Sequence, residues 1–167
     1  MSKYRETDLG QRMKPDSFFE DLISDRTPFA AGTSREVYEV PDDASVVIKK
    51  AKHQFPGSNM AEWFVWSGVR QTPLEPLFAE ILLISASCKY IMMARLDPIT
   101  QGDHANIPPM PIWLNDRKPD AFGKLGDRIK AMDYGVLNYP ELFVQTVEPL
   151  PMQVAAKNNR ERGISGG

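Results

Sequence analysis

Cysteine and histidine are scarce in this chain of 167 residues, which contains one cysteine, Cys88, and two histidines. A single cysteine excludes an internal disulfide. The sequence pairs Cys88 with no histidine, so nothing indicates that its thiol is a catalytic nucleophile. His53 and His104 lie far apart without a second ligand at metal-binding spacing. The sequence therefore gives no indication of a zinc or iron site.

Long apolar runs and an excess of one charge are also lacking. The run Ile81 to Ile84 is far shorter than the roughly 20 apolar residues that span a bilayer, and the charged N-terminus has no apolar core of a secretory signal. Twenty basic and 22 acidic residues give a net charge of −2, which argues against a broad nucleic-acid-binding surface. We therefore expect a soluble intracellular protein without membrane or nucleic-acid partners.

The patterns that are present predict an α+β fold. Residues 1–14 are polar and we expect them to be poorly ordered. An apolar stripe that includes Phe19 and Ile23 predicts a short helix, which Asp16 and Ser17 are expected to cap. Residues 36–40 and 45–49 alternate as two strands around a turn, which predicts an antiparallel hairpin. The expected elements that follow are a helix over 59–69, strands over 78–86 and 89–96 around a turn at 87–88, a proline-rich segment over 97–112 without a regular helix, a loop over 116–123 and a short strand over 128–132.

Two features of the hairpin indicate a binding site. Alternation places Val47 and Lys49 on one face of their strand, and Glu62 in the next helix offers an opposite charge to the ammonium. Gly32 precedes the first strand in a segment of small residues, as in a loop whose backbone N–H groups cover phosphates, although Arg35 hinders such an approach. Each feature also has an ordinary explanation: Gly32 is typical of a hairpin turn, and Lys49 is typical of the exposed basic end of a strand.

The second half of the chain carries the more specific pattern. Asp116-Arg117-Lys118-Pro119 resembles the catalytic loop of protein kinases, and Asp133-Tyr134-Gly135 resembles their Asp-Phe-Gly magnesium turn. The preceding order of glycine turn, strand ending in Val-Val-Ile-Lys, helix and two strands is that of a kinase small lobe. The chain thus resembles protein kinases from about residue 28 to 138, and is most similar to the very small kinase-like proteins encoded by bacteriophages.

This resemblance implies an α+β, protein-kinase-like fold with an antiparallel N-lobe sheet, one helix and a minimal, truncated C-lobe. The implied divisions are an N-terminal extension with a short helix (1–27), the N-lobe (28–96), the truncated C-lobe (97–139) and a C-terminal tail (140–167). ATP and Mg²⁺ are the implied ligands. The implied roles are catalytic for Asp116 and Lys118, metal-binding for Asp133, and nucleotide-binding for Gly32, Ser34, Lys49, Glu62, Met93 and Leu96.

The chain departs from the family at positions that matter for catalysis. Ala121 stands where an asparagine holds the second magnesium ion, and a methyl group offers no oxygen to a hard cation; Asp120 is a candidate substitute. Asn115 precedes Asp116 where the family has histidine and arginine. Only about twenty residues separate Leu96 from Asp116, too few for the helix that supports the catalytic loop, and small misplacements there are costly.

We therefore interpret the sequence as that of a degenerate kinase that binds a nucleotide, a host or phage protein, or both, in the cytoplasm of an infected bacterium. One alternative is an active minimal Ser/Thr kinase or small-molecule phosphotransferase that uses ATP and Mg²⁺. Another is a structural component of the virion that reuses the fold, because a fold does not determine a function. For Asp133, the alternative to a metal ligand is an aspartate that only shapes a tight turn.

Overall fold

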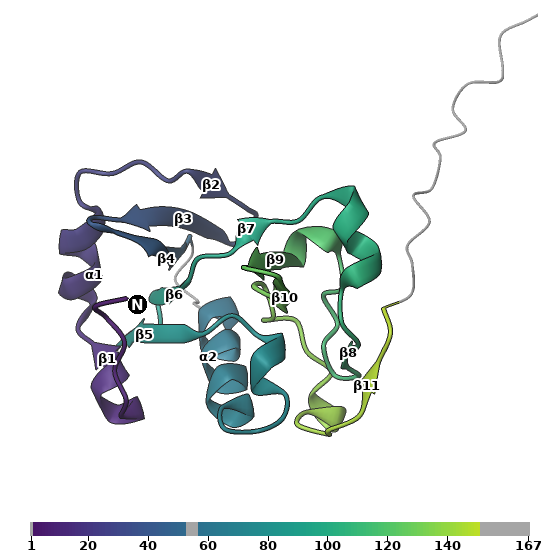
Figure 1. Cartoon of the computed structure of the whole chain (residues 1–167). Coiled ribbons are helices and arrows are strands. Elements are labelled where there is room, and N and C mark those ends of the chain that lie inside the picture. Colours follow the sequence, from purple (N-terminus) through teal and green to yellow (C-terminus); the bar gives the residue numbers. More distant parts are fainter. Residues whose placement is uncertain (1, 53–56, 151–167) are drawn as a thin grey trace, which may run out of the picture.

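The computed structural model describes residues 2–52 and 57–150, which form an α+β structure around a six-stranded sheet (Figure 1). The strands lie in the order β1-β5-β6-β4-β3-β2, and every neighbouring pair is antiparallel except β1 and β5. The expected α+β class with a mostly antiparallel sheet is therefore confirmed. Residues 151–167 of the predicted C-terminal tail lie outside the described residues. Within the described ranges, no helix combines the length and apolar character needed to cross a membrane.

Four strands of the sheet, β3 to β6, are those that the sequence predicted, with ends shifted by a few residues. Two residues with positive φ, Asp42 (59°) and Cys88 (60°), lie in the turns of the two hairpins, where left-handed backbone is common. The very short strands β1 and β2 extend the sheet at its two edges. The bounds are β1 Met13–Lys14, β2 Ala30–Ala31, β3 Arg35–Val40, β4 Asp43–Ala51, β5 Ile81–Ser85 and β6 Tyr90–Ala94.

The two α-helices lie on opposite faces of this sheet. Helix α1, Asp16–Ile23, packs in one apolar cluster with Ile48, whereas α2, Gly57–Val69, packs in another with Val47. Neighbouring side chains of a strand point to opposite faces, so the two clusters are separated by the sheet. Both helices were predicted. Lys49 points to the α2 side with Val47, as the alternation of β4 predicted, and this places its ammonium against the helix.

The predicted cap of α1 is wrong. Pro15 occupies the N-cap position and makes no side-chain hydrogen bond there, while Asp16 lies in the first turn of the helix. The Asp16 carboxylate instead accepts hydrogen bonds from the Ser87 backbone N–H at 3.2 Å and from the Ser87 hydroxyl. Asp16 therefore ties α1 to the turn between β5 and β6, a long-range contact that local helix signals do not reveal.

Residues 2–14 pack against the sheet, which corrects the expectation that this part of the N-terminal segment is poorly ordered. Leu9–Arg12 forms a 3₁₀ helix, and β1 pairs in parallel with β5. Arg12 is only 3% exposed, and its side chain donates hydrogen bonds to the carbonyl oxygens of Ile81 at 2.6 Å and Glu6 at 2.8 Å. Polar composition was misleading here because one arginine satisfies buried backbone at the edge of the sheet.

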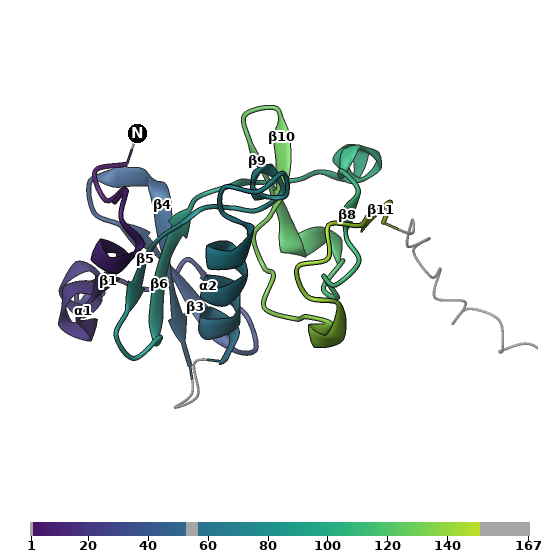
Figure 2. The same ribbon diagram turned by 90° about the horizontal axis from the view of Figure 1, so that it is seen from below.

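After β6 the chain forms short strands and 3₁₀ helices, and α2 lies between this part and the sheet in both views (Figures 1 and 2). The part is held by an aromatic core in which Phe78 stacks on Trp113 with ring centroids 5.6 Å apart and meets Tyr134 edge-on at 5.1 Å. These rings belong to the same apolar cluster as α2. The elements after β6 are β7 Asp97–Pro98, β8 Met110–Pro111, β9 Phe122–Leu125, β10 Arg128–Ala131 and β11 Val147–Glu148, with 3₁₀ helices at Gln101–Asn106, Pro119–Ala121 and Tyr139–Glu141. A further 3₁₀ helix, Glu75–Leu77, lies between α2 and β5.

The burial of Arg12 gives a test of the ordered N-terminus. We expect Arg12→Ala to lower the free energy of unfolding by about 2 kcal/mol, because it leaves a buried carbonyl unpaired and removes an ion pair with Glu80. Urea denaturation measures this change. Arg5→Ala is the matched control: Arg5 pairs with the same Glu80, but its side chain is 44% exposed, so its loss costs at most about 1 kcal/mol. Equal effects of the two substitutions would contradict a docked N-terminal segment.

Candidate functional site

Lys49 and Glu62 form a buried ion pair between β4 and α2. The Lys49 ammonium lies 3.3 Å from each carboxylate oxygen of Glu62. The Glu62 side chain has no exposed surface and that of Lys49 is 10% exposed. The ammonium also donates to the backbone carbonyl oxygen of Met132. The predicted pairing of these two residues is present, and it joins the sheet, the helix and the segment that follows β10.

Asp133 reaches the same place from the other half of the chain. It follows β10, and its carboxylate lies 2.6 Å from the guanidinium of Arg35. The next residue, Tyr134, donates its backbone N–H to Glu62 Oε1 at 3.1 Å. The structure therefore brings together the amine and the two acids, Lys49, Glu62 and Asp133, that the sequence places far apart.

Arg35 is the central member of this group and was not among the predicted site residues. Its guanidinium is paired with both oxygens of Glu62, at 2.7 and 2.9 Å, in a bidentate arrangement, and it also binds Asp133. We call Arg35, Lys49, Glu62 and Asp133 the charge cluster. A signal for Arg35 does exist: it lies two residues before Val37, which is opposite Lys49 in the hairpin, so alternation places Arg35 on the face of Lys49.

Asn59 supports the cluster from the first turn of α2 and was also missed. Its side chain is fully buried, and Nδ2 donates to the carbonyl oxygens of Lys89 at 2.9 Å and Cys88 at 3.1 Å. Its Oδ1 accepts a hydrogen bond of 3.3 Å from Arg35. Asn59 therefore connects the guanidinium to the turn between β5 and β6. One turn of helix separates Asn59 from Glu62, which puts both side chains on one face.

The charges of the cluster balance, with two cations against two anions. Burial opposes the charge of Arg35, but Glu62 and then Asp133 raise its pKa above the ordinary value. Burial lowers the pKa of Lys49, and the attraction of Glu62 only partly opposes this. Burial would raise the pKa of Asp133, but the positive charges of Arg35 and Lys49 outweigh it, so that pKa lies below its usual range. Asp133 therefore stays ionised at neutral pH.

Gly32 and Ser34 lie in the exposed turn before β3. The Gly32 N–H donates to the carbonyl oxygen of Arg35 at 2.9 Å, and the Gly32 carbonyl accepts from the Lys52 ammonium at 2.6 Å. The Ser34 carbonyl accepts from the Lys52 N–H at 2.9 Å. A Cβ on Gly32 would meet no atom within 4 Å. The backbone of this turn is thus engaged within the hairpin, and packing does not require glycine there.

Asp116 and Lys118 are not brought to the charge cluster. Asp116 accepts a hydrogen bond of 3.4 Å from the Lys118 backbone N–H within its own loop, and the Lys118 side chain is exposed. Arg117 between them anchors the loop through the Leu114 carbonyl at 2.7 Å and an ion pair with Glu148. In the part of the chain that the structure describes, neither predicted catalytic side chain contacts the cluster.

Met93 and Leu96 are core residues. Met93 lies opposite Val47 in the sheet and is 1% exposed, and Leu96 is 8% exposed in the same apolar cluster. Ala121 is likewise buried, and its carbonyl accepts hydrogen bonds from the N–H groups of Met132 at 2.8 Å and Asp133 at 3.2 Å. Ala121 therefore positions Asp133 through its backbone, and its side chain supplies no ligand atom.

The residues present do not fit the magnesium ion that the resemblance implies. Magnesium needs several oxygen ligands in near-octahedral geometry. Both oxygens of Glu62 are taken by cations, and Asp133 is paired with Arg35. Among residues 2–52 and 57–150, no group of three or more His, Cys, Asp or Glu side chains is placed to hold a metal ion. The guanidinium of Arg35 already occupies the position between Glu62 and Asp133 where a metal ion would have to bind.

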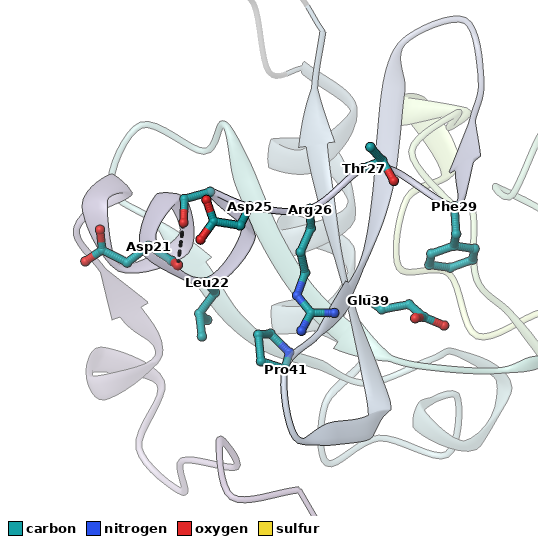
Figure 3. A pocket seen from close by; sticks show the side chains of 9 residues that line it. Asp21, Leu22, Asp25, Arg26, Thr27, Phe29, Glu39 and Pro41 are labelled. Atoms are coloured by element: carbon teal, nitrogen blue, oxygen red, sulfur yellow. Dashed lines mark hydrogen bonds between the residues drawn. The ribbon is translucent and has the colours of Figure 1, made fainter.

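A hollow of about 530 Å³ lies elsewhere, between the end of α1 and β3 (Figure 3). Its lining is mixed, with the carboxylates of Asp25 and Glu39 on either side of Arg26 and the ring of Phe29 nearby. It shares no residue with the charge cluster and contains none of the predicted site residues. This hollow and the convergence of charges are therefore two separate features of the molecule.

The lowered pKa of Asp133 predicts how stability depends on pH. A carboxyl group with a lower pKa in the folded state stabilises above its unfolded pKa of about 3.9, and this contribution is lost as pH falls through the folded pKa. We therefore expect the free energy of unfolding to fall more steeply below about pH 4 in the wild type than in Asp133→Asn. Urea denaturation between pH 3 and pH 7 checks this. Parallel curves for the two proteins would show that Asp133 is not ion-paired.

Comparison with known proteins gives no further information about the function of this site. No protein-family model matches the chain, and no curated protein matches it significantly. The function is therefore argued from the residues and contacts described above. Among those contacts, the convergence of Arg35, Lys49, Glu62 and Asp133 is the most specific, because side chains from β3, β4, α2 and the segment after β10 meet in one place.

Proposed function

We propose that this chain is a kinase-like protein that works by binding a partner and does not transfer phosphate. The observation that carries the proposal is the Arg35 guanidinium, which bridges Glu62 and Asp133. In protein kinases the corresponding acids serve the lysine and the metal. Here an internal cation satisfies both of them. A site whose charges are already paired offers little to a metal–nucleotide complex.

The kinase-like part of the proposal is supported by the order and pairing of the elements. A glycine turn precedes the hairpin of β3 and β4, Lys49 lies in β4, and Glu62 lies in the helix that follows. Two strands come next, and Asp133 directly follows the hairpin of β9 and β10. A lysine–glutamate ion pair between strand and helix is a required feature of kinases. This combination favours a kinase-like origin for the charge cluster.

The absence of phosphate transfer follows from two positions. Asp116, the residue expected to orient a substrate hydroxyl, is held within its own loop at Lys118, and misplacement of about 1 Å can cost a hundredfold in rate. Asp133, the expected metal ligand, is paired with Arg35. Phosphoryl transfer depends on metal ions that neutralise the developing charge. In this arrangement neither the residue expected to orient the substrate hydroxyl nor the expected metal ligand is available for catalysis.

Binding of a protein partner is supported by exposed apolar side chains on α2. Met60 is 56% exposed and Phe64 is 52% exposed, one helical turn apart. The ring of Phe64 lies 5.5 Å from that of Phe143, which itself packs on Trp113. Apolar side chains that gather on a surface are typical of interaction sites. The outer face of α2 is therefore our preferred location for a partner.

One observation favours a second candidate, an active phosphotransferase. The Asp133 side chain is 46% exposed, and Arg35 lies next to the exposed turn of Gly32 to Ser34. If that turn carried Arg35 away, Lys49 would remain paired with Glu62, and Asp133 would be free to meet a ligand. This candidate requires a change in the hairpin, whereas the binding function requires none. A structural role in a virion is not favoured by any particular contact.

Labelled ATP with Mg²⁺ separates the two candidates. We expect no phosphate incorporation into the protein or into added substrates, and a change in melting temperature below about 1 °C at millimolar nucleotide. A ligand at 100 times its Kd stabilises by about 2.7 kcal/mol, which corresponds to roughly 5–10 °C for a chain of this size. Magnesium-dependent transfer that disappears in Asp133→Ala would overturn the proposal and favour the phosphotransferase.

A further inference from the structure

Phe143 has a backbone conformation that is unusual for its side chain. Its φ of 68° lies in the left-handed region, where a bulky residue is a clear outlier. A residue keeps such a conformation only where its surroundings impose it, and such positions gather at ligand-binding sites and at segments that switch between two states. The contacts of the Phe143 ring supply that constraint here.

The ring of Phe143 lies in a notch on α2 that exists because residue 68 is glycine. A Cβ on Gly68 would overlap with atoms of the ring, so any other residue there would force the ring away. The ring centroid also lies 5.5 Å from that of Phe64 and 6.0 Å from that of Trp113. Glycine weakens a helix relative to alanine. Gly68 and Phe143 are therefore each unfavourable locally, and both are needed to seat the ring.

The segment that carries this ring, residues 139–145, has few other attachments, and we call it the strap. Backbone hydrogen bonds at Asn138 and Thr146 fix its two ends. Between these ends, among the residues that the structure describes, one hydrogen bond joins the strap to the rest of the chain, from Trp113 Nε1 to the Val144 carbonyl oxygen at 3.0 Å. Segments with few such contacts open at a lower free energy than the core does.

We propose that the strap is a latch on the outer face of α2, which Phe143 closes. In the closed state the ring fills the notch at Gly68. In the open state the φ of Phe143 relaxes, the notch and the neighbouring rings of Phe64 and Trp113 are uncovered, and the rest of the fold stays intact. The uncovered notch fits an aromatic side chain of a partner protein, because an aromatic ring fills it when the latch is closed. The role in partner binding rests on the proposed function, whereas the opening itself does not.

Hydrogen exchange measured by NMR tests the opening in the wild-type protein. The Trp113 indole N–H, which donates to Val144, reports on the strap, and the N–H of the buried residue Ile91 in β6 reports on the core. After correction for intrinsic rates, we expect the indole N–H to exchange at least about 100-fold faster than that of Ile91, because the strap opens without global unfolding. Equal protection of the two groups would overturn the latch.

Gly68→Ala shifts the strap toward its open state, because the added Cβ displaces the ring. We expect the exchange of the Trp113 indole N–H to rise about tenfold or more with that of Ile91 unchanged, and the melting temperature to fall by roughly 2–4 °C. Gly57→Ala is the matched control in the same helix, since its Cβ would meet no atom within 4 Å, and it should change neither exchange rate. Identical results for the two variants would show that the ring is not seated at Gly68.

Phe143→Ala gives a second, independent test of the seated ring. It should also speed the exchange of the Trp113 indole N–H. In this background Gly68→Ala should no longer lower the melting temperature, because no ring remains to be displaced and alanine favours the helix. A drop in melting temperature as large as in the wild-type background would contradict the contact between Phe143 and Gly68.

Anilinonaphthalene sulfonate is the probe for the uncovered surface, because this aromatic dye binds exposed apolar groups. Apparent affinity scales with the populated fraction of the binding-competent state, so Gly68→Ala should raise that of the dye by about tenfold and Gly57→Ala should not. A Gly68→Ala protein whose strap opens but which binds the dye no better than the wild type would overturn the role in partner binding. Phosphate transfer from ATP, which would overturn the proposed function, changes none of these results, so the two proposals are tested separately.

Discussion

The buried carboxylate of Glu62 is the constraint on which the rest of the structure depends. Its side chain has no exposed surface, and a buried charge costs several kcal/mol unless charged and hydrogen-bonding partners surround it. Those partners come from three places: Lys49 from β4, Arg35 from β3 and the backbone N–H of Tyr134 after β10. One residue of α2 therefore fixes how the hairpin, the helix and the second half of the chain meet.

The cluster is complete without a ligand, and this shapes the functional interpretation. A catalytic site keeps charged groups free for its substrate and metal, whereas Arg35 here pairs with both acids. Buried ionic groups add little net stability compared with apolar packing, but breaking one of their pairs is costly. The cluster is thus suited to holding one arrangement of the chain. A protein that presents a fixed surface, such as the outer face of α2 with Met60 and Phe64, benefits from that property.

Local patterns predicted the hairpin, both helices and the Lys49–Glu62 pair, because alternation and helical spacing record which face of an element is buried. They failed for Arg12, whose burial depends on the distant backbone of Ile81. They also failed for Arg35, which was considered as a position in a phosphate-binding loop and not as a side chain on the inner face of β3. The position of Asp116 could not be predicted from the sequence, because it depends on contacts of its loop such as those of Arg117 with Leu114 and Glu148.

A double-mutant cycle between Arg35 and Glu62 tests the central claim most directly. The free energy of unfolding is measured for the wild type, Arg35→Met, Glu62→Leu and the double variant. We expect each single substitution to cost about 3 kcal/mol or more, because it breaks a buried ion pair and leaves the charges of the cluster unbalanced. We expect the double substitution to cost less than the sum of the two by at least about 1 kcal/mol. Additive effects, within about 0.5 kcal/mol, would contradict a buried ion pair between these residues and the account built on it.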